Sequence, residues 1–269
     1  MTVELPQEII DKIVDEIAGV EFLHTPRILA LQACSMVSSA WHHRSRKYLF
    51  QRVCFSNGNF RKWCKKVRPG ADGPSRHVTF IGLHYDSTVD LIHTSPSHIS
   101  SFTNLQILHI NGISLLDKKD AVYLGGLGRT VRELRLQDGS TTMDLFLPFL
   151  KRFTNLEDLQ LLGIWTPSSP KFKSRDHSKF PCLKGALQIG RSSRGWEYFA
   201  EFICQLARLP STLHTIAVSS RSGMPAEVNQ LFAACRKTLT RLEFRDCEFP
   251  ALHPVSTVDG FQISPRRPT

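Results

Sequence analysis

The chain lacks several features that would assign it to a class at once. It has no apolar run of the length that a bilayer span requires, and its first residues do not have the form of a secretory signal peptide. Its seven cysteines are an odd number and include no C-x-x-C pair, which argues against a disulfide framework and a zinc site. We therefore expect an intracellular protein, cytoplasmic or nuclear, with no membrane segment and no bound metal.

Acidic residues are missing from one long segment. Residues 22–71 contain no Asp or Glu but hold ten of the 34 Lys and Arg residues, and the remaining bases balance the 24 acids. The net charge of +10 is therefore local. Such a basic segment is ordinarily a helical face exposed to water. The more specific interpretation is that its charge attracts an acidic partner. The cluster at residues 61–68 (RKWCKKVR) could instead contact phosphate, but no known nucleic-acid motif surrounds it.

Motifs for catalysis are also missing. Residues 125–130 are rich in glycine but lack the G-x-x-x-x-G-K-[ST] spacing that cradles phosphate, and residues 190–195 are one residue too long for a nucleophile elbow. His42 and His43 lie beside Trp41 in the basic segment, where exposed or partner-facing histidines are favoured over metal ligands or bases. We therefore expect no enzyme activity, no catalytic residue and no cofactor.

The first fifty residues carry the strongest local patterns. A first helix is predicted to start at Pro6, because proline is tolerated in the first turn of a helix. The apolar residues of this helix recur at helical spacing: Ile9, Ile10, Ile13, Val14 and Ile17. A second helix is predicted from Thr25 and Pro26 as N-cap and N1, and a third from Ser38 or Ser39. Helices this short cannot all bury their apolar surface in so small a module, so part of it should face a partner. The alternative is that they only cap the larger domain.

The same block resembles an F-box nearly end to end. The matching features are Leu5-Pro6-x-Glu8-Ile9, Cys34-Ser35-x-Val37, Ser39-x-Trp41 and the closing Tyr48-Leu49-Phe50. The resemblance covers about residues 3–55 and implies docking on the adaptor subunit of an SCF-type (cullin-RING) ubiquitin ligase, and through it on a cullin. It places this surface in or near six residues: Leu5, Pro6, Ile9, Ile13, Val37 and Trp41. One departure is the long first connection, residues 18–25, which leaves the angle between the first two helices open.

A short form, Leu-x-x-Leu-x-Leu, repeats from about residue 76. Clear copies begin at Leu105, Val131, Leu156, Leu213 and Leu239, with first positions 26, 25, 57 and 26 residues apart, and the gap of 57 has room for one further copy. A degenerate copy with one extra residue lies at residues 183–189, and a weak one at 77–83. The tetrapeptide Phe-Thr-Asn-Leu occurs twice, at 102–105 and 153–156, which supports true repetition.

This period resembles that of leucine-rich repeats, in which each unit is a short strand with a return helix. Residues 143–150 and 196–209 have the helical spacing expected of such returns. The Asn or Cys that should follow each strand is mostly missing, so the turn geometry stays open. A non-repeating α/β domain is the alternative. Both interpretations predict parallel strands in one sheet with helices opposite, and an exposed strand face for recognition.

The fold expected is therefore α/β: a three-helix F-box at 1–55, a basic linker at 56–75, an irregular leucine-rich-repeat-like solenoid at 76–249 and a disordered tail at 250–269. Residues 167–179 read as a polar insertion loop.

By resemblance, the protein would be a substrate-recognition subunit that holds a target protein on its repeat domain, with ubiquitin transfer done by other subunits. Two alternatives remain, a non-catalytic scaffold that uses the F-box outside ubiquitination, and a nucleic-acid-associated protein that uses the 61–68 cluster. The sequence does not identify the target.

Overall fold

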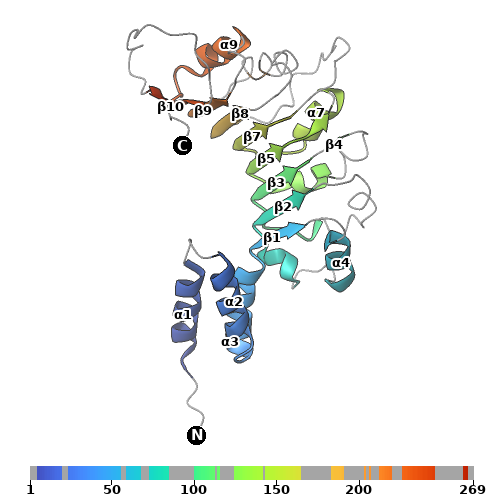
Figure 1. The fold of residues 1–269 in the computed structure, drawn as a ribbon, viewed down its shortest axis with the longest axis vertical. Helices are drawn as coiled ribbons and strands as arrows, with labels where there is room; N and C mark the ends of the chain where they lie inside the picture. The colour runs from blue at the N-terminus through green and yellow to red at the C-terminus, as the bar shows by residue number, and fades with distance from the viewer. Residues whose placement is uncertain are drawn as a thin grey trace.

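The computed structural model contains a helical unit followed by a long parallel sheet (Figure 1). The structure describes residues 5–19, 24–55, 59–67, 73–84, 100–112, 114–115, 124–141, 143–164, 183–190, 203, 206, 212–219, 226–245 and 263–265. Within these residues the buried apolar side chains form two separate clusters, one in the helical unit and one along the sheet. The described part of the chain therefore has two hydrophobic cores.

The helical unit consists of α1 (Gln7–Gly19), α2 (His24–Ser35) and α3 (Ser39–Leu49). Its core is built from Ile10 and Val14 of α1 and Leu31 of α2. The third helix begins as predicted, with Ser38 in the extended N-cap conformation. The second begins two residues earlier than predicted, at His24 and not at Pro26, so Thr25 and Pro26 lie inside its first turn. Proline fits there because the first-turn N–H groups have no intrahelical partner.

All paired strands of the main sheet run parallel. Their spatial order follows the chain: β1 (Arg52–Phe55), β2 (Phe80–His84), β3 (Ile107–Asn111), β5 (Glu133–Gln137), β7 (Asp158–Leu162), β8 (Ala186–Gly190), β9 (Thr215–Ser219), β10 (Arg241–Arg245) and β11 (Ile263–Pro265). A second sheet pairs β4 (Ser114–Leu115) with β6 (Ser140–Thr141). The α/β class with a parallel sheet, predicted from the repeats, is confirmed.

The register of this sheet follows the sequence repeat. The middle apolar positions of successive copies lie opposite one another and form one buried row: Leu108, Leu134, Leu159, Leu187 and Ile216. The last apolar positions form a second row: Ile110, Leu136, Leu161, Ile189 and Val218. The extra residue of the degenerate copy precedes β8, so its strand stays in register. Because side chains alternate between the two faces of a strand, both rows point to the same side of the sheet.

Helices pack on that side. They include α4 (Asn59–Lys66), α7 (Met143–Leu150) and α9 (Ala226–Cys235), with the short 3₁₀ helix η2 (Gly126–Arg129). A second 3₁₀ helix, η1 (Pro74–His77), contacts α3. Phe60, Phe146 and Leu231 from the three α-helices belong to the same buried cluster as the strand rows. The helix predicted at 143–150 is α7, whereas in 196–209 only residues 203 and 206 are described, both helical.

Polar side chains before the strands tie neighbouring units together. The Asn104 side-chain amide donates to the Arg76 carbonyl at 2.7 Å, and Asn155 donates to the Arg129 carbonyl at 2.7 Å. Both asparagines come from the repeated Phe-Thr-Asn-Leu tetrapeptide. These two hydrogen bonds hold the chain at the amino ends of β3 and β7.

The sheet begins earlier in the chain than the boundary expected at residue 76. β1 lies inside the block that resembles an F-box, yet it pairs with β2 in the main sheet. The segment expected to be a linker contains α4. Three residues of the expected disordered tail form β11 on the edge of β10, and the rest of 250–269, like the 167–179 loop, lies outside the described residues. No described helix is long and apolar enough to cross a membrane.

Candidate functional site

The first helix carries two apolar stripes that have different surroundings. Ile10 and Val14 point into the helical core and are 4% and 0% exposed. Leu5, Ile9 and Ile13, spaced four residues apart, are 47%, 45% and 37% exposed. Residues four apart lie above one another on a helix, so Ile9 and Ile13 form a line on its surface, and Leu5 lies two residues before the helix begins. We call these three residues the outer stripe of α1.

Other large apolar side chains are exposed in the middle of α2 and in the turn that follows it. Leu29, Met36 and Val37 are 59%, 85% and 65% exposed. Together with the outer stripe they are all of the exposed large hydrophobic residues in the described part of the chain, and none lies in the sheet domain. Scattered single exposures are common on monomers, but all of these lie in one small unit, which makes the helical unit the candidate for docking.

An ion-pair network fixes α1 on α3 and so positions the outer stripe. Arg44 of α3 donates from Nε to Asp15 Oδ1 at 2.9 Å and from Nη2 to Oδ2 at 2.6 Å. The Tyr48 hydroxyl donates to the same carboxylate at 2.8 Å, and Asp11 lies 3.8 Å from the Arg44 Nε. These hydrogen bonds, first that from Arg44 and then that from Tyr48, lower the pKa of Asp15. The sequence analysis did not single out Asp15, because its partners lie some thirty residues away along the chain.

The structure places the six predicted docking residues in two environments. Leu5, Ile9 and Ile13 belong to the outer stripe, and Val37 is exposed in the turn after α2. Pro6 is exposed, and its carbonyl accepts from the N–H groups of Ile9 and Ile10 to start the helix.

Trp41 differs from the other five. It is half-buried and packs against the core of the helical unit, so at least part of its role is structural. Leu29 and Met36, which the sequence analysis did not single out, are more exposed than most of the predicted set. Their signal in the sequence is weak because α2 is apolar around much of its circumference.

The face of the sheet opposite the helices is polar. Its side chains pair across neighbouring strands, as in Gln160, whose amide donates to Gln188 Oε1 at 3.0 Å. Arg135 donates from Nε to Glu133 at 2.6 Å along its own strand. The rings of His84 and His109 lie 6.4 Å apart, centroid to centroid, on adjacent strands. Burial lowers the pKa of His109, and the Arg135 charge lowers it further.

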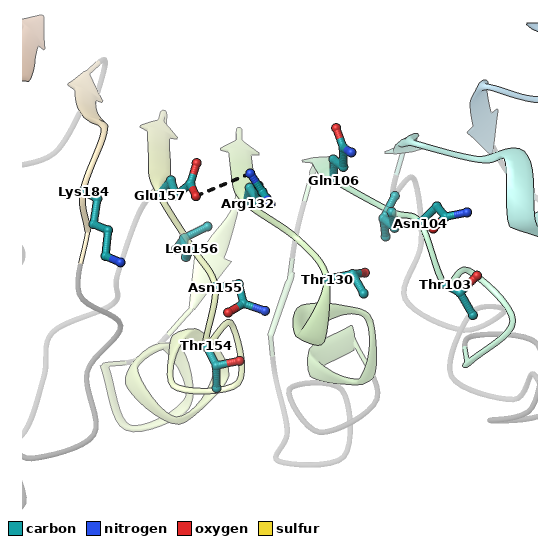
Figure 2. Close-up of a pocket in the computed structure, with 11 residues that line it drawn as sticks. Thr103, Asn104, Gln106, Thr130, Arg132, Thr154, Asn155, Leu156, Glu157 and Lys184 are labelled. Carbon is teal, nitrogen blue, oxygen red and sulfur yellow. Dashed lines mark ion pairs between the residues drawn. The ribbon is translucent and has the colours of Figure 1, made fainter.

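A groove of about 510 Å³ runs along the amino ends of four strands (Figure 2). It is lined by residues 103–106 before β3, Thr130 and Arg132 before β5, residues 154–157 before β7 and Lys184 before β8. Arg132 and Glu157 reach toward each other across it, with Nη1 and Oε1 3.7 Å apart. The lining is made mainly of hydroxyl, amide and charged side chains.

Two observations concern groups that could take part in chemistry. They contain no group of three or more His, Cys, Asp or Glu side chains that could hold a metal ion. Burial raises the pKa of the Cys64 thiol to about 11, so this cysteine is protonated at neutral pH and is a poor nucleophile.

No family model matches the chain, and no curated protein is significantly similar to it. The fold defines an α/β protein with an N-terminal helical unit and a parallel sheet of repeated strands.

Proposed function

We propose that the chain is the substrate-recognition subunit of an SCF-type ubiquitin ligase. The helical unit acts as an F-box that docks on the adaptor subunit, and the sheet domain is a leucine-rich-repeat-like solenoid that binds a target protein. The observation that carries this proposal is the outer stripe of α1, which leaves three large apolar side chains exposed to water while a neighbouring stripe of the same helix, Ile10 and Val14, builds the core. A helix that served only as a cap would need one stripe.

The sheet supports the second half of the proposal. Its strands follow one another in chain order, with repeat positions in register, which is the arrangement of a solenoid in which each unit contacts only its neighbours. Its open face carries hydrogen-bonding side chains such as Gln160 and Gln188, which suit recognition of a polypeptide surface.

The mechanism is proximity. A receptor that holds the ligase at one end and the target on the sheet converts ubiquitin transfer into an effectively intramolecular encounter, and the raised effective concentration accounts for the rate gain. The chain then contributes no group to the chemistry of transfer. A scaffold that uses the same docking surface outside ubiquitination is the competing function, and it would bind the adaptor without a cullin.

The proposal is tested by the affinity of the full chain for the adaptor subunit, measured by titration calorimetry with Leu5→Ser/Ile9→Ser/Ile13→Ser. Full burial of such a side chain contributes about 1.5–3 kcal/mol, so completing the burial of three half-exposed ones contributes about 3 kcal/mol in total. That corresponds to about a hundredfold loss of affinity.

A matched control on the same helix is Lys12→Ser/Glu16→Ser, which changes two exposed polar residues and keeps the outer stripe. It should bind like the parent, and circular dichroism should show both variants to be helical. Equal loss of affinity in the two variants, or no binding by the parent, would overturn the proposal.

A further inference from the structure

Basic side chains line one side of the molecule from the helical unit to the middle of the sheet. Arg46 and Lys47 lie in the last turn of α3, Arg76 lies in η1, and Arg132 and Lys184 line the groove at the amino ends of the strands. We call these five residues the basic strip. They come from four elements that the sequence separates widely, and the excess of bases found at 22–71 accounts for only two of them.

The groove forms one end of the strip. Among its eleven lining residues two are cations and only Glu157 is an acid. The Arg132–Glu157 pair is long, at 3.7 Å, and both side chains are open to water, 65% and 46% exposed. Exposed pairs of this kind contribute little to stability, so Arg132 can exchange this carboxylate for another at small cost. Thr103, Thr130 and Thr154 place hydroxyl groups along the same line (Figure 2).

The other end lies where α3 meets η1. The Asn104 side chain, at the edge of the groove, donates to the Arg76 carbonyl at 2.7 Å and joins the two ends. Arg76 donates from Nε to His77 Nε2 at 3.2 Å, so that nitrogen accepts and carries no proton. Burial, followed by the charges of Arg76 and Arg46, lowers the pKa of His77. Cations therefore gather here closely enough to repel a further positive charge.

We propose that the basic strip binds an acidic, extended segment of a partner protein along the amino ends of the strands. From Lys184 to Asn104 the segment crosses three strand spacings, about 14 Å, which is the length of about four extended residues. Its carboxylates meet Lys184 and Arg132, and its next residues reach Arg76 and the last turn of α3.

Two features favour a peptide over a nucleic acid. No aromatic side chain lines the groove, whereas single-stranded nucleic acids are bound by stacking bases on aromatic rings. The hydroxyl and amide groups in the lining instead match the backbone of an extended peptide. This surface is made of other residues than the outer stripe of α1, so the inference does not depend on adaptor docking.

The test uses the full chain and a fluorescein-labelled peptide of about ten residues that alternates glutamate with glycine, long enough to span the strip. Fluorescence anisotropy at low and high salt should show binding that salt weakens. A peptide with glutamine in place of glutamate should bind much more weakly. Arg132→Gln/Lys184→Gln and Arg46→Gln/Lys47→Gln should each weaken binding of the acidic peptide about tenfold.

The matched control is Lys62→Gln/Lys65→Gln, which removes the same charge from α4, a helix that begins shortly after the carboxyl end of β1 and is remote from the groove (Figure 1). It should bind the peptide within twofold of the parent. Equal loss in all three variants would show that only net charge matters and would overturn the proposal, as would no binding by the parent. Tighter binding of an oligouridine of equal charge would overturn it in favour of a nucleic-acid surface. Adaptor affinity, measured in parallel, should be unchanged in Arg132→Gln/Lys184→Gln.

Discussion

The ion pair between α1 and α3 gives the sharpest test of how the docking surface is held in place. We consider Asp15→Asn, which keeps the shape of the side chain but removes its charge. The Asp15 carboxylate accepts three hydrogen bonds, two from Arg44 and one from Tyr48. An amide oxygen in place of Oδ1 can still accept from Arg44 Nε and the Tyr48 hydroxyl, but the NH₂ group in place of Oδ2 would face the Arg44 Nη2 donor, and the charge is lost.

The exposure and the geometry of the Arg44–Asp15 pair set the size of the expected loss of stability. The pair is bidentate, which favours it, but its side chains are 27% and 43% exposed, so water screens the attraction. A hydrogen bond to a charged group contributes about 1.5–3 kcal/mol when well shielded, and we discount this to about 1.5 kcal/mol for loss of the carboxylate charge and of its bond to Arg44 Nη2. In a double-mutant cycle with Arg44→Gln, the coupling energy should be about 1 kcal/mol.

Native-state hydrogen exchange of the α1 amides is the suitable assay, because it reports the opening of this helix apart from unfolding of the sheet. The opening free energy of α1 should fall in Asp15→Asn, with the amides of β5 and β7 unaffected. The pKa of Asp15 is lowered in the folded chain, so its contribution is fully present above the unfolded carboxyl pKa and is lost as the pH falls through the folded value.

Glu16→Gln provides the control, since Glu16 is exposed on the same helix. A coupling energy near zero between Asp15 and Arg44, with α1 still protected, would refute the reasoning. It would mean that apolar packing alone fixes the helix.

Three further predictions concern the sheet domain. Asn155→Ala should lower the free energy of unfolding by about 1 kcal/mol in urea titrations, because the Arg129 carbonyl loses its side-chain donor, and an unchanged midpoint would contradict this. Gly128→Ala should be destabilising in thermal unfolding, since a Cβ there would lie 2.7 Å from the backbone oxygen of Arg152, and a melting temperature equal to the parent's would show that the loop can shift. His109→Gln should flatten the pH dependence of stability. Burial, and then the charge of Arg135, lowers the pKa of His109 in the folded chain. As the pH falls below the ordinary histidine pKa, the unfolded chain therefore takes up a proton before the folded chain does. In that pH range the stability of the parent should fall more than that of the variant.

Much of the architecture was predictable from local patterns. The repeat of apolar positions gave parallel strands because each unit needs its neighbours to bury its leucines, and the register of Leu134 with Leu108 and Leu159 follows from it. The degenerate copy at 183–189 was also predictable, because its apolar positions fall in the gap between the copies that begin at Leu156 and Leu213. The start of the sheet was not, because the short strand Arg52–Phe55 has no leucine pattern and is recognised only by its pairing with β2.

The candidate surfaces were predictable in part. The outer stripe could be anticipated because Ile9 and Ile13 recur with Ile10 and Val14 on too small a module, but the sequence could not say which stripe faces inward. Periodicity alone also did not distinguish Trp41, which packs on the helical core, from the exposed residues. The basic strip could not be found from the sequence at all, since Arg132 and Lys184 are isolated bases that only the parallel sheet brings to one edge.

The measurement that tests the central claim most directly is co-elution of the full chain with purified adaptor subunit and cullin in size-exclusion chromatography. The proposed function predicts one ternary complex that the Leu5→Ser/Ile9→Ser/Ile13→Ser variant cannot enter. Binding of the adaptor without the cullin would contradict a role in the ligase, and failure to bind the adaptor would contradict the F-box assignment itself.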